Sequence, residues 1–148
     1  MKIRGLALLL ASALITAAFA DRADTPPGLK PAVAEDGISV FFSPKGGCTD
    51  AIVDQVHAAK ESLDVQAYGF TSKDIAKAIR EAHERGVKVR VVLDKSNETG
   101  KYSGATYLFN AGVPVWLDSK HAIAHNKVMV IDGANVITGS FNFPAHLQ

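Results

Sequence analysis

The sequence lacks several features that define special classes of protein. Cys48 is the only cysteine among 148 residues, so no intramolecular disulfide can form. Aromatic residues make up only 7%, and neither sign of charge dominates, with 16 Lys and Arg against 15 Asp and Glu. This balance excludes a globally basic nucleic-acid-binding surface. The 47% of hydrophobic residues is instead typical of one ordinary globular domain.

The one long apolar run lies at the amino terminus. Residues 6–18 are almost wholly apolar, Lys2 and Arg4 precede them, and residues 18–20 read Ala-Phe-Ala. A basic start, a short apolar core and a small-x-small end predict a secretory signal peptide over residues 1–20, and hence a periplasmic or secreted protein. The run is short for a membrane span, so we expect no stable membrane insertion after cleavage, with an uncleaved anchor as the alternative.

The remainder divides into a linker and one domain. Residues 21–36 contain three prolines, one glycine and little apolar content, which predicts a linker without a core of its own. Residues 37–148 show no internal repeat and form a single predicted domain. Without Lys2 and Arg4, 14 basic residues face 15 acidic ones, a net charge of −1. Attraction to a polyanion must then come from a local patch.

Hydrophobic spacing alternates between the periods of strands and of helices after residue 37. Strands are predicted over residues 38–42, 63–67, 87–93, 113–117, 127–131 and 135–138, and helices are predicted to begin at Thr49 or Asp50, at residues 71–74 and at Ser103. Strands separated by helices favour parallel pairing, whereas the short Asp-Gly connection between the last two favours an antiparallel hairpin. The pattern predicts an α/β fold with a mixed β-sheet flanked by helices.

Polar residues gather around this hairpin in a pattern that suits phosphate chemistry. His125 and Lys127 share a face of a strand, where they offer a nucleophile or proton carrier beside a cation rather than core side chains. Asp132 lies at an odd interval, so we assign it to orienting the hairpin or supporting the site rather than to proton transfer. Ser140 and Asn142 share a parity and can donate hydrogen bonds to non-bridging phosphate oxygens.

These residues resemble the signature of the phospholipase D superfamily. The matching segments are His125-x-Lys127 with four residues before Asp132, and Gly139-Ser140-x-Asn142, within the motif region 120–143. The resemblance to the small, exported, single-motif bacterial endonucleases of that superfamily is broader, covering about residues 37–143, and includes Phe42-Ser43-Pro44, residues 67–71 and Arg85-Gly86-Val87. It implies the phospholipase D/nuclease-like α/β sandwich.

The resemblance also implies an activity, namely a metal-independent, cofactor-free phosphodiesterase that works through a phosphohistidine. Catalytic residues would be His125, Lys127 and Asp132, with His125 as nucleophile or general acid; Lys127, Ser140 and Asn142 would bind the phosphate. Because in-line displacement needs one neutral and one protonated imidazole and the chain has one motif, we expect a homodimer that pairs two copies of the site. Nucleic acid (DNA or RNA) is favoured over phospholipid as substrate, because the chain lacks an amphipathic lipid-docking stretch.

One departure from the family supports an alternative. Related enzymes continue with another strand and a terminal helix, and that strand brings a glutamate to the catalytic histidine. In this sequence no acidic residue follows Asp132, and the usual last strand and helix are lacking. The alternative is therefore a truncated, catalytically impaired remnant that acts at most as an anion-binding protein, with one sheet edge left open.

Other polar residues have simpler interpretations. The spacing of His121 and His125 would suit a metal only on a helix, and four extended residues span about 13 Å, so no metal site is predicted. Lys95, Lys101 and Lys120 either form a local basic rim or are scattered surface charges. The Asp94 loop is interpreted as a solvated connection, although the ends of such strands often border active sites.

Overall fold

The computed structural model describes residues 32–33, 37–98 and 103–143. The predicted signal peptide and most of the predicted linker lie outside these residues. Within that linker, β1 (Ala32–Val33) pairs antiparallel with β2 (Ser39–Val40). No helix in the described part of the chain is long and apolar enough to cross a membrane.

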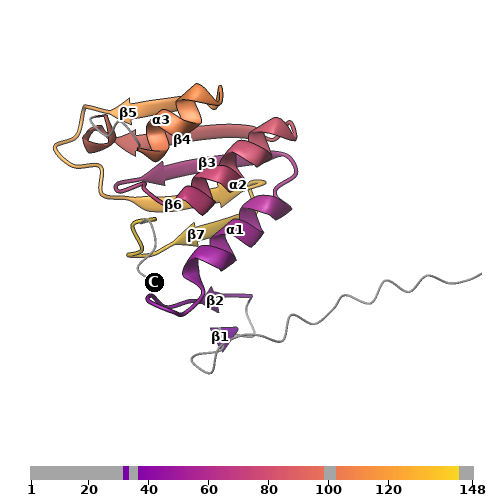
Figure 1. Ribbon diagram of the computed structural model, residues 1–148. Helices are drawn as coiled ribbons and strands as arrows, with labels where there is room; N and C mark the ends of the chain where they lie inside the picture. Colours follow the sequence, from indigo (N-terminus) through magenta and orange to yellow (C-terminus); the bar gives the residue numbers. More distant parts are fainter. Residues whose placement is uncertain (1–31, 34–36, 99–102, 144–148) are drawn as a thin grey trace, which may run out of the picture.

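The main sheet has five strands and is mixed, as predicted. In spatial order these are β5 (Val115–Asp118), β4 (Lys88–Asp94), β3 (Ser62–Ala67), β6 (Lys127–Ile131) and β7 (Asn135–Thr138). Strands β3, β4 and β5 are parallel, whereas β6 is antiparallel to both β3 and β7 (Figure 1). The β6–β7 turn has positive φ at Asp132 and Gly133, which suits the twist of a tight hairpin.

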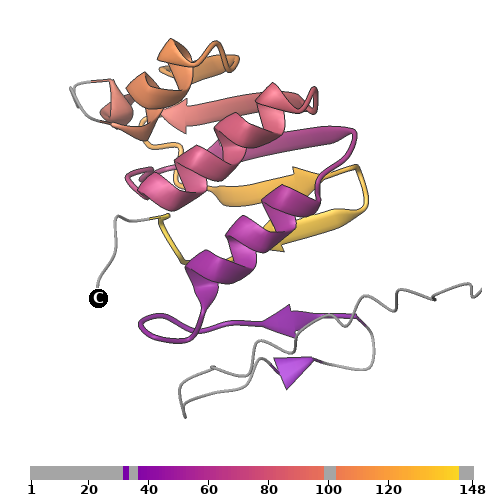
Figure 2. The ribbon, with the colours of Figure 1, turned by 45° about the vertical axis from the view of Figure 1, so that its right-hand side comes forward.

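The three α-helices of the described residues lie on one face of this sheet (Figures 1 and 2). They are α1 (Cys48–Ala58), α2 (Lys73–Glu84) and α3 (Gly104–Asn110). The crossovers β3–α2–β4 and β4–α3–β5 proceed in the same direction across the sheet, so crossovers of one hand place both helices on the same side. On α2, the side chains of Ile75, Ile79 and Ala82 are fully buried in the core.

The opposite face of the sheet carries no helix within residues 37–98 and 103–143 (Figure 2). Trp116 is 52% exposed there and Val136 is 63% exposed. Arg90 and Asp64, which are register partners on β4 and β3, form a bidentate ion pair with both nitrogen–oxygen distances at 2.6 Å. The guanidinium of Arg90 lowers the pKa of Asp64. The helices of the predicted sandwich are thus confined to one layer in the described chain.

The helix starts follow local capping, with one exception. Ser72 accepts a hydrogen bond from Ile75 N at 3.4 Å, and Ser103 accepts one from Thr106 N at 3.2 Å, as the sequence predicts for α2 and α3. The expected Thr49 or Asp50 cap of α1 is wrong, because α1 starts at Cys48 after Gly47, which has a φ of 75° and makes no side-chain cap. Glycine adopts this left-handed conformation without the steric cost of a Cβ.

The strand predicted over residues 38–42 is much shorter in the structure. Only Ser39–Val40 is a strand, and it pairs with β1 outside the five-stranded sheet. Ile38 is 57% exposed and Phe42 is 52% exposed, so alternation in this segment does not reflect a buried face. Period-2 spacing predicted an extended conformation correctly, but it could not specify a pairing partner.

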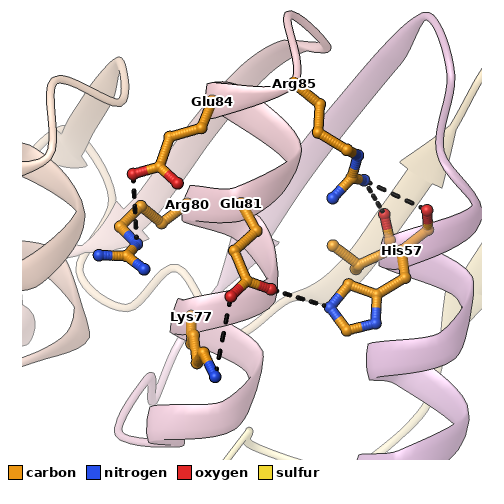
Figure 3. A network of polar contacts seen from close by, with 7 residues as sticks. His57, Lys77, Arg80, Glu81, Glu84 and Arg85 are labelled. Carbon is orange, nitrogen blue, oxygen red and sulfur yellow. Dashed lines mark hydrogen bonds and ion pairs between the residues drawn. The ribbon is translucent and has the colours of Figure 1, made fainter.

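A polar network joins α1 to α2 (Figure 3). The Arg85 guanidinium donates to the carbonyls of Val56 and His57 at 3.2 Å each, which satisfies the carboxyl end of α1. His57 Nε2 lies 3.2 Å from Glu81 Oε2, and Glu81 also pairs with Lys77 at 3.8 Å. The exposed His57 side chain thus takes part in this contact between the helices.

Candidate active site

The predicted site residues other than Asp132 lie along one row of strand ends of the sheet, which we call the site edge. This edge contains the carboxyl ends of β3, β4 and β5, the start of β6 and the end of β7, because the register pairs Ala67 with Lys127, Val128 with Thr138 and Asp94 with Asp118. The segment from Asp118 to Lys127 crosses the edge from β5 to β6. The carboxyl ends of strands are where α/β folds commonly place ligands.

His125 is exposed at this edge, just before β6 begins. Its ring packs on the ring of Tyr68, with centroids 4.6 Å apart and planes tilted by 57°. Its backbone is fixed from the same side, because Tyr68 N donates to the neighbouring Asn126 carbonyl at 3.0 Å. The described residues provide no hydrogen-bond partner for the imidazole, which leaves this exposed ring accessible from solvent.

Lys127 is 6% exposed and lies in the buried row of β6 with Met129 and Ile131. The sequence argument that this pair does not belong in the core is therefore right for His125 and wrong for Lys127. Burial of the lysine stem is compatible with its charge, because the side chain sits at the end of the strand. Its Nζ donates to the His125 carbonyl at 2.8 Å and lies 5.4 Å from the Tyr68 ring centroid. The ammonium is thus held beside His125.

Asp132 lies at the opposite edge of the sheet, at the far end of β6. Asn126 and the five residues of β6 separate it from His125, and β6 alone corresponds to about 16 Å. Its carboxylate accepts hydrogen bonds from the backbone N–H groups of Lys60, Glu61 and Ser62 at 2.8 to 3.2 Å. These bonds, with Ser62 foremost, lower the pKa of Asp132. The geometry matches the expected orienting of the hairpin.

Ser140 and Asn142 follow β7 and return the chain to the site edge. Both are exposed. A Cβ added to Gly69, just after β3, would lie 3.6 Å from the Asn142 Cβ, so the two segments are in close contact. The next carbonyl, that of Phe143, accepts from Thr71 N at 3.0 Å and from Ser72 N at 2.9 Å. The structure therefore places the Gly-Ser-x-Asn segment on the same edge as His125.

Sequence reasoning missed Tyr68 and undervalued Asp94. Asp94 is 3% exposed, and its carboxylate accepts from Ala124 N at 2.8 Å, next to His125. Hydrogen bonds from the Ser96 side chain and from the Ala124 and Ser96 backbones lower the pKa of Asp94 to about 2. The available signal was an aspartate at the end of the clearest strand, but its partner lies 30 residues away.

The remaining candidates occupy the β4–β5 part of the edge. The Lys95 ammonium donates to the His121 carbonyl at 3.3 Å, and Lys120 is exposed nearby, whereas Lys101 lies outside the described residues. His121 Nδ1 lies 2.7 Å from Asp118 Oδ2, and this contact lowers the pKa of Asp118. Among residues 37–98 and 103–143, no group of three or more His, Cys, Asp or Glu side chains is arranged to hold a metal ion.

A family model described as cardiolipin synthase, phospholipase D-like domain, matches residues 52–146. The chain belongs to the phospholipase D superfamily. This superfamily assignment confirms the resemblance expected from the His-x-Lys and Gly-Ser-x-Asn segments, and the match runs from within α1 through β7.

Relatives in the superfamily are hydrolases by name. The chain is 46% identical over 111 residues to the phospholipase D of Rickettsia prowazekii, covering 75% of the chain and 54% of that protein. It is 36% identical over 85 residues to the mitochondrial cardiolipin hydrolase of Xenopus tropicalis, covering 57% of the chain and 40% of that protein. The chain thus spans about half the length, or less, of these curated relatives.

Two solved structures share the fold. Nuc of Salmonella typhimurium, a phospholipase D family member, is 40% identical with a TM-score of 0.66, over 70% of this chain and 69% of that one. NucT of Helicobacter pylori is 29% identical with a TM-score of 0.54, over 64% and 65% of the respective chains. The mixed sheet with flanking helices, predicted from the sequence, is therefore confirmed as the fold of this superfamily.

Proposed function

We propose that the protein is a metal-independent phosphodiesterase that cleaves nucleic acid through a phosphohistidine at His125. The observation that supports this function best is the shared contact with Tyr68. The exposed His125 imidazole packs on its ring, and the Lys127 ammonium lies 5.4 Å from its centroid. This arrangement places a nucleophile and a fixed cation side by side, as attack on a phosphodiester requires.

The proposed reaction has two displacements at phosphorus. A neutral His125 nitrogen forms the nitrogen–phosphorus bond while the bond to the leaving alkoxide breaks, and a protonated imidazole gives its proton to that alkoxide. Water then attacks the phosphohistidine and gives a proton back to the second imidazole, which releases phosphomonoester and free His125. Lys127, Ser140 and Asn142 offset the charge on the non-bridging oxygens in both steps.

The second imidazole is proposed to come from another copy of the chain. The described part of the chain presents one His-x-Lys segment, and the imidazole of His121 is engaged with Asp118. A two-fold dimer would place two His125 side chains and two Lys127 side chains around one phosphate. Asp132 would support this site only indirectly, through the hairpin.

Nucleic acid is the proposed substrate because the exposed groups at the site edge are mainly polar. They include Lys95, Ser96, Lys120, His121, Asn126, Ser140 and Asn142, beside the apolar Ile123, which is 60% exposed. Two exposed lysines next to the site give a nearly neutral protein a local attraction for a polyanion. Phospholipid is the second candidate, favoured by relatives named phospholipase D and cardiolipin hydrolase.

The decisive test is hydrolysis of plasmid DNA by the purified chain with and without excess chelator. We expect cleavage that survives the chelator and disappears in His125→Gln, together with a phosphoenzyme in acid-free quenched samples. Cardiolipin and phosphatidylcholine vesicles, assayed in parallel, separate the two substrate classes. If no diester is hydrolysed but anions are still bound, the alternative of a catalytically impaired, anion-binding remnant would be established. Loss of activity in chelator would exclude the metal-free mechanism.

Mixing chains tests the shared site. If each site needs both copies of His125, activity in mixtures of wild type and His125→Gln should fall with the square of the wild-type fraction. A linear fall would show that one chain suffices.

Export is proposed from residues 1–20, and amino-terminal sequencing of protein from the periplasm and medium would detect cleavage after Ala20.

A further inference from the structure

We propose that Asp94 and Tyr68 are positioning residues that hold His125 in the orientation needed for attack on phosphorus. They act from the ends of two neighbouring strands, β4 and β3. The inference concerns how the chain presents His125, and it rests on the proposed function only for its effect on turnover.

Asp94 fixes the backbone immediately before His125. One carboxylate oxygen accepts from Ala124 N at 2.8 Å, and the other accepts from Ser96 N at 2.9 Å within its own loop. Asp94 is 3% exposed and Ala124 is 5% exposed, so water competes little for this bond. A buried, charge-assisted hydrogen bond is a stronger restraint than one on the surface. The approach of the chain to His125 is therefore tied to the sheet.

Tyr68 restrains the other side of His125 in two ways. Its N–H donates to the Asn126 carbonyl at 3.0 Å, and its ring packs on the imidazole with centroids 4.6 Å apart. Residues 124 and 126, which flank His125, are thus each bonded to a different strand end. The ring contact then limits how the imidazole can rotate about its side-chain torsions.

A third side chain joins the two restraints. The amide nitrogen of Asn97, which is 8% exposed, donates to the Tyr68 carbonyl at 2.6 Å and to the Asp94 carbonyl at 3.0 Å. The ends of β3 and β4 are thereby held together beneath the site. Because the described residues give the His125 imidazole no hydrogen bond of its own, its orientation depends on this framework. Small misplacement of a reacting group can cost about 10²-fold in rate.

The first test replaces the Asp94 carboxylate. In Asp94→Asn one oxygen remains, which can accept from Ser96 N, while the amide NH₂ opposes Ala124 N–H and breaks the tether. We expect kcat on DNA to fall about 10- to 100-fold with KM changed little, as for other groups that orient a catalytic residue. Asp64→Asn is the matched control. It also removes a carboxylate with a lowered pKa from the sheet, but on the face without helices, and should retain kcat.

Tyr68 provides a second, independent pair of variants in case Asp94→Asn does not fold. Tyr68→Phe keeps the ring contact and the backbone bond, and should retain kcat within about twofold. Tyr68→Leu removes only the ring and should lower kcat by about 10-fold or more. Similar kcat values for the two variants would overturn the role of the ring.

Proton NMR of the histidine rings reads the position of His125 whether or not the chain hydrolyses diesters. An aromatic ring at 4.6 Å should displace the His125 ring resonances, which are assigned by their loss in His125→Gln. We expect this displacement to persist in Tyr68→Phe and Asp64→Asn and to diminish in Asp94→Asn and Tyr68→Leu. If Asp94→Asn folds with unchanged His125 resonances and unchanged kcat, Asp94 is not a positioning residue. If the wild-type protein hydrolyses no diester but shows the displaced His125 resonances and their expected response to the variants, only the proposed function is refuted.

Discussion

At each of the two edges of the sheet, an aspartate carboxylate accepts hydrogen bonds from a remote backbone segment, but the two edges have different roles. At one edge Asp94 accepts a hydrogen bond from Ala124 N, and at the other Asp132 accepts from the N–H groups of Lys60, Glu61 and Ser62. Both carboxylates tie a remote backbone segment to a strand end. The Asp94 edge presents the exposed His125, Ser140 and Asn142. The motif that spans β6 therefore has its first residues at the proposed site and its last residue in contacts that secure the fold.

The largest expected effect is a loss of activity when His125, at the Asp94 edge, is replaced. His125→Gln should lower the rate of diester hydrolysis by about 10³-fold or more, because it removes the nucleophile. Its melting temperature should stay near that of the wild type, since the imidazole is exposed and makes no hydrogen bond within the described residues. Steady-state kinetics and thermal unfolding monitored by circular dichroism measure the two quantities. A variant with full turnover would remove His125 from the mechanism.

The converse change is expected at the other edge. Asp132→Ala leaves three backbone N–H groups without their acceptor and should lower the melting temperature by several degrees. Activity per folded molecule should remain within a few-fold of the wild type, because the carboxylate lies about 16 Å from the site edge. Calorimetry, and kinetics well below the transition, would test this. A loss as large as that of His125→Gln at unchanged stability would give Asp132 a direct catalytic role.

Acid should weaken both edges. The folded pKa of Asp94 is about 2, below the value of about 3.9 for an unfolded aspartate, so its contribution to stability is complete above pH 4. That contribution is lost as the pH falls through about 2, because protonation ends charge-assisted acceptance. Unfolding followed in urea between pH 5 and pH 2 should therefore show a shallower decline for Asp94→Asn than for wild type. Parallel curves would mean that Asp94 titrates normally.

The smallest effect is expected away from both edges. Asp64→Asn removes the ion pair with Arg90 on the face without helices, where the Arg90 side chain is 69% exposed. Exposed ion pairs contribute little, so the melting temperature should change by about a degree or less. Differential scanning calorimetry at low and high salt would detect the change. A large shift would indicate that this face is covered in solution.

Hydrophobic spacing predicted most of the elements. Helices α2 and α3, capped by Ser72 and Ser103, and strands β3, β4, β6 and β7 follow directly from caps and periodicity. The cap of α1 was missed, because a left-handed Gly47 is not distinguished from an ordinary loop glycine in sequence. The short β2 was overestimated, because alternation says nothing about whether a partner strand exists.

The candidate site was likewise only partly predictable from the sequence. His125, Lys127, Ser140 and Asn142 were identifiable from spacing, since strand parity and the Gly-Ser-x-Asn segment are local patterns. Burial of Lys127 was not predictable, because it depends on helices packed over the buried row of β6. The contacts of Tyr68 with His125 and Lys127 could not be predicted either, since β3 precedes these two residues by almost 60 positions.

The sequence by itself determined the alternation of elements and the superfamily signature, and it predicted which side chains carry the chemistry, because these depend on local periodicity and residue type. Only the tertiary structure decided that the motif is split between two edges of the sheet and that Asp94 reaches the backbone beside His125. Those relations depend on strand order and register. Such pairings bring together residues 30 or more positions apart, and no local pattern encodes which of them meet.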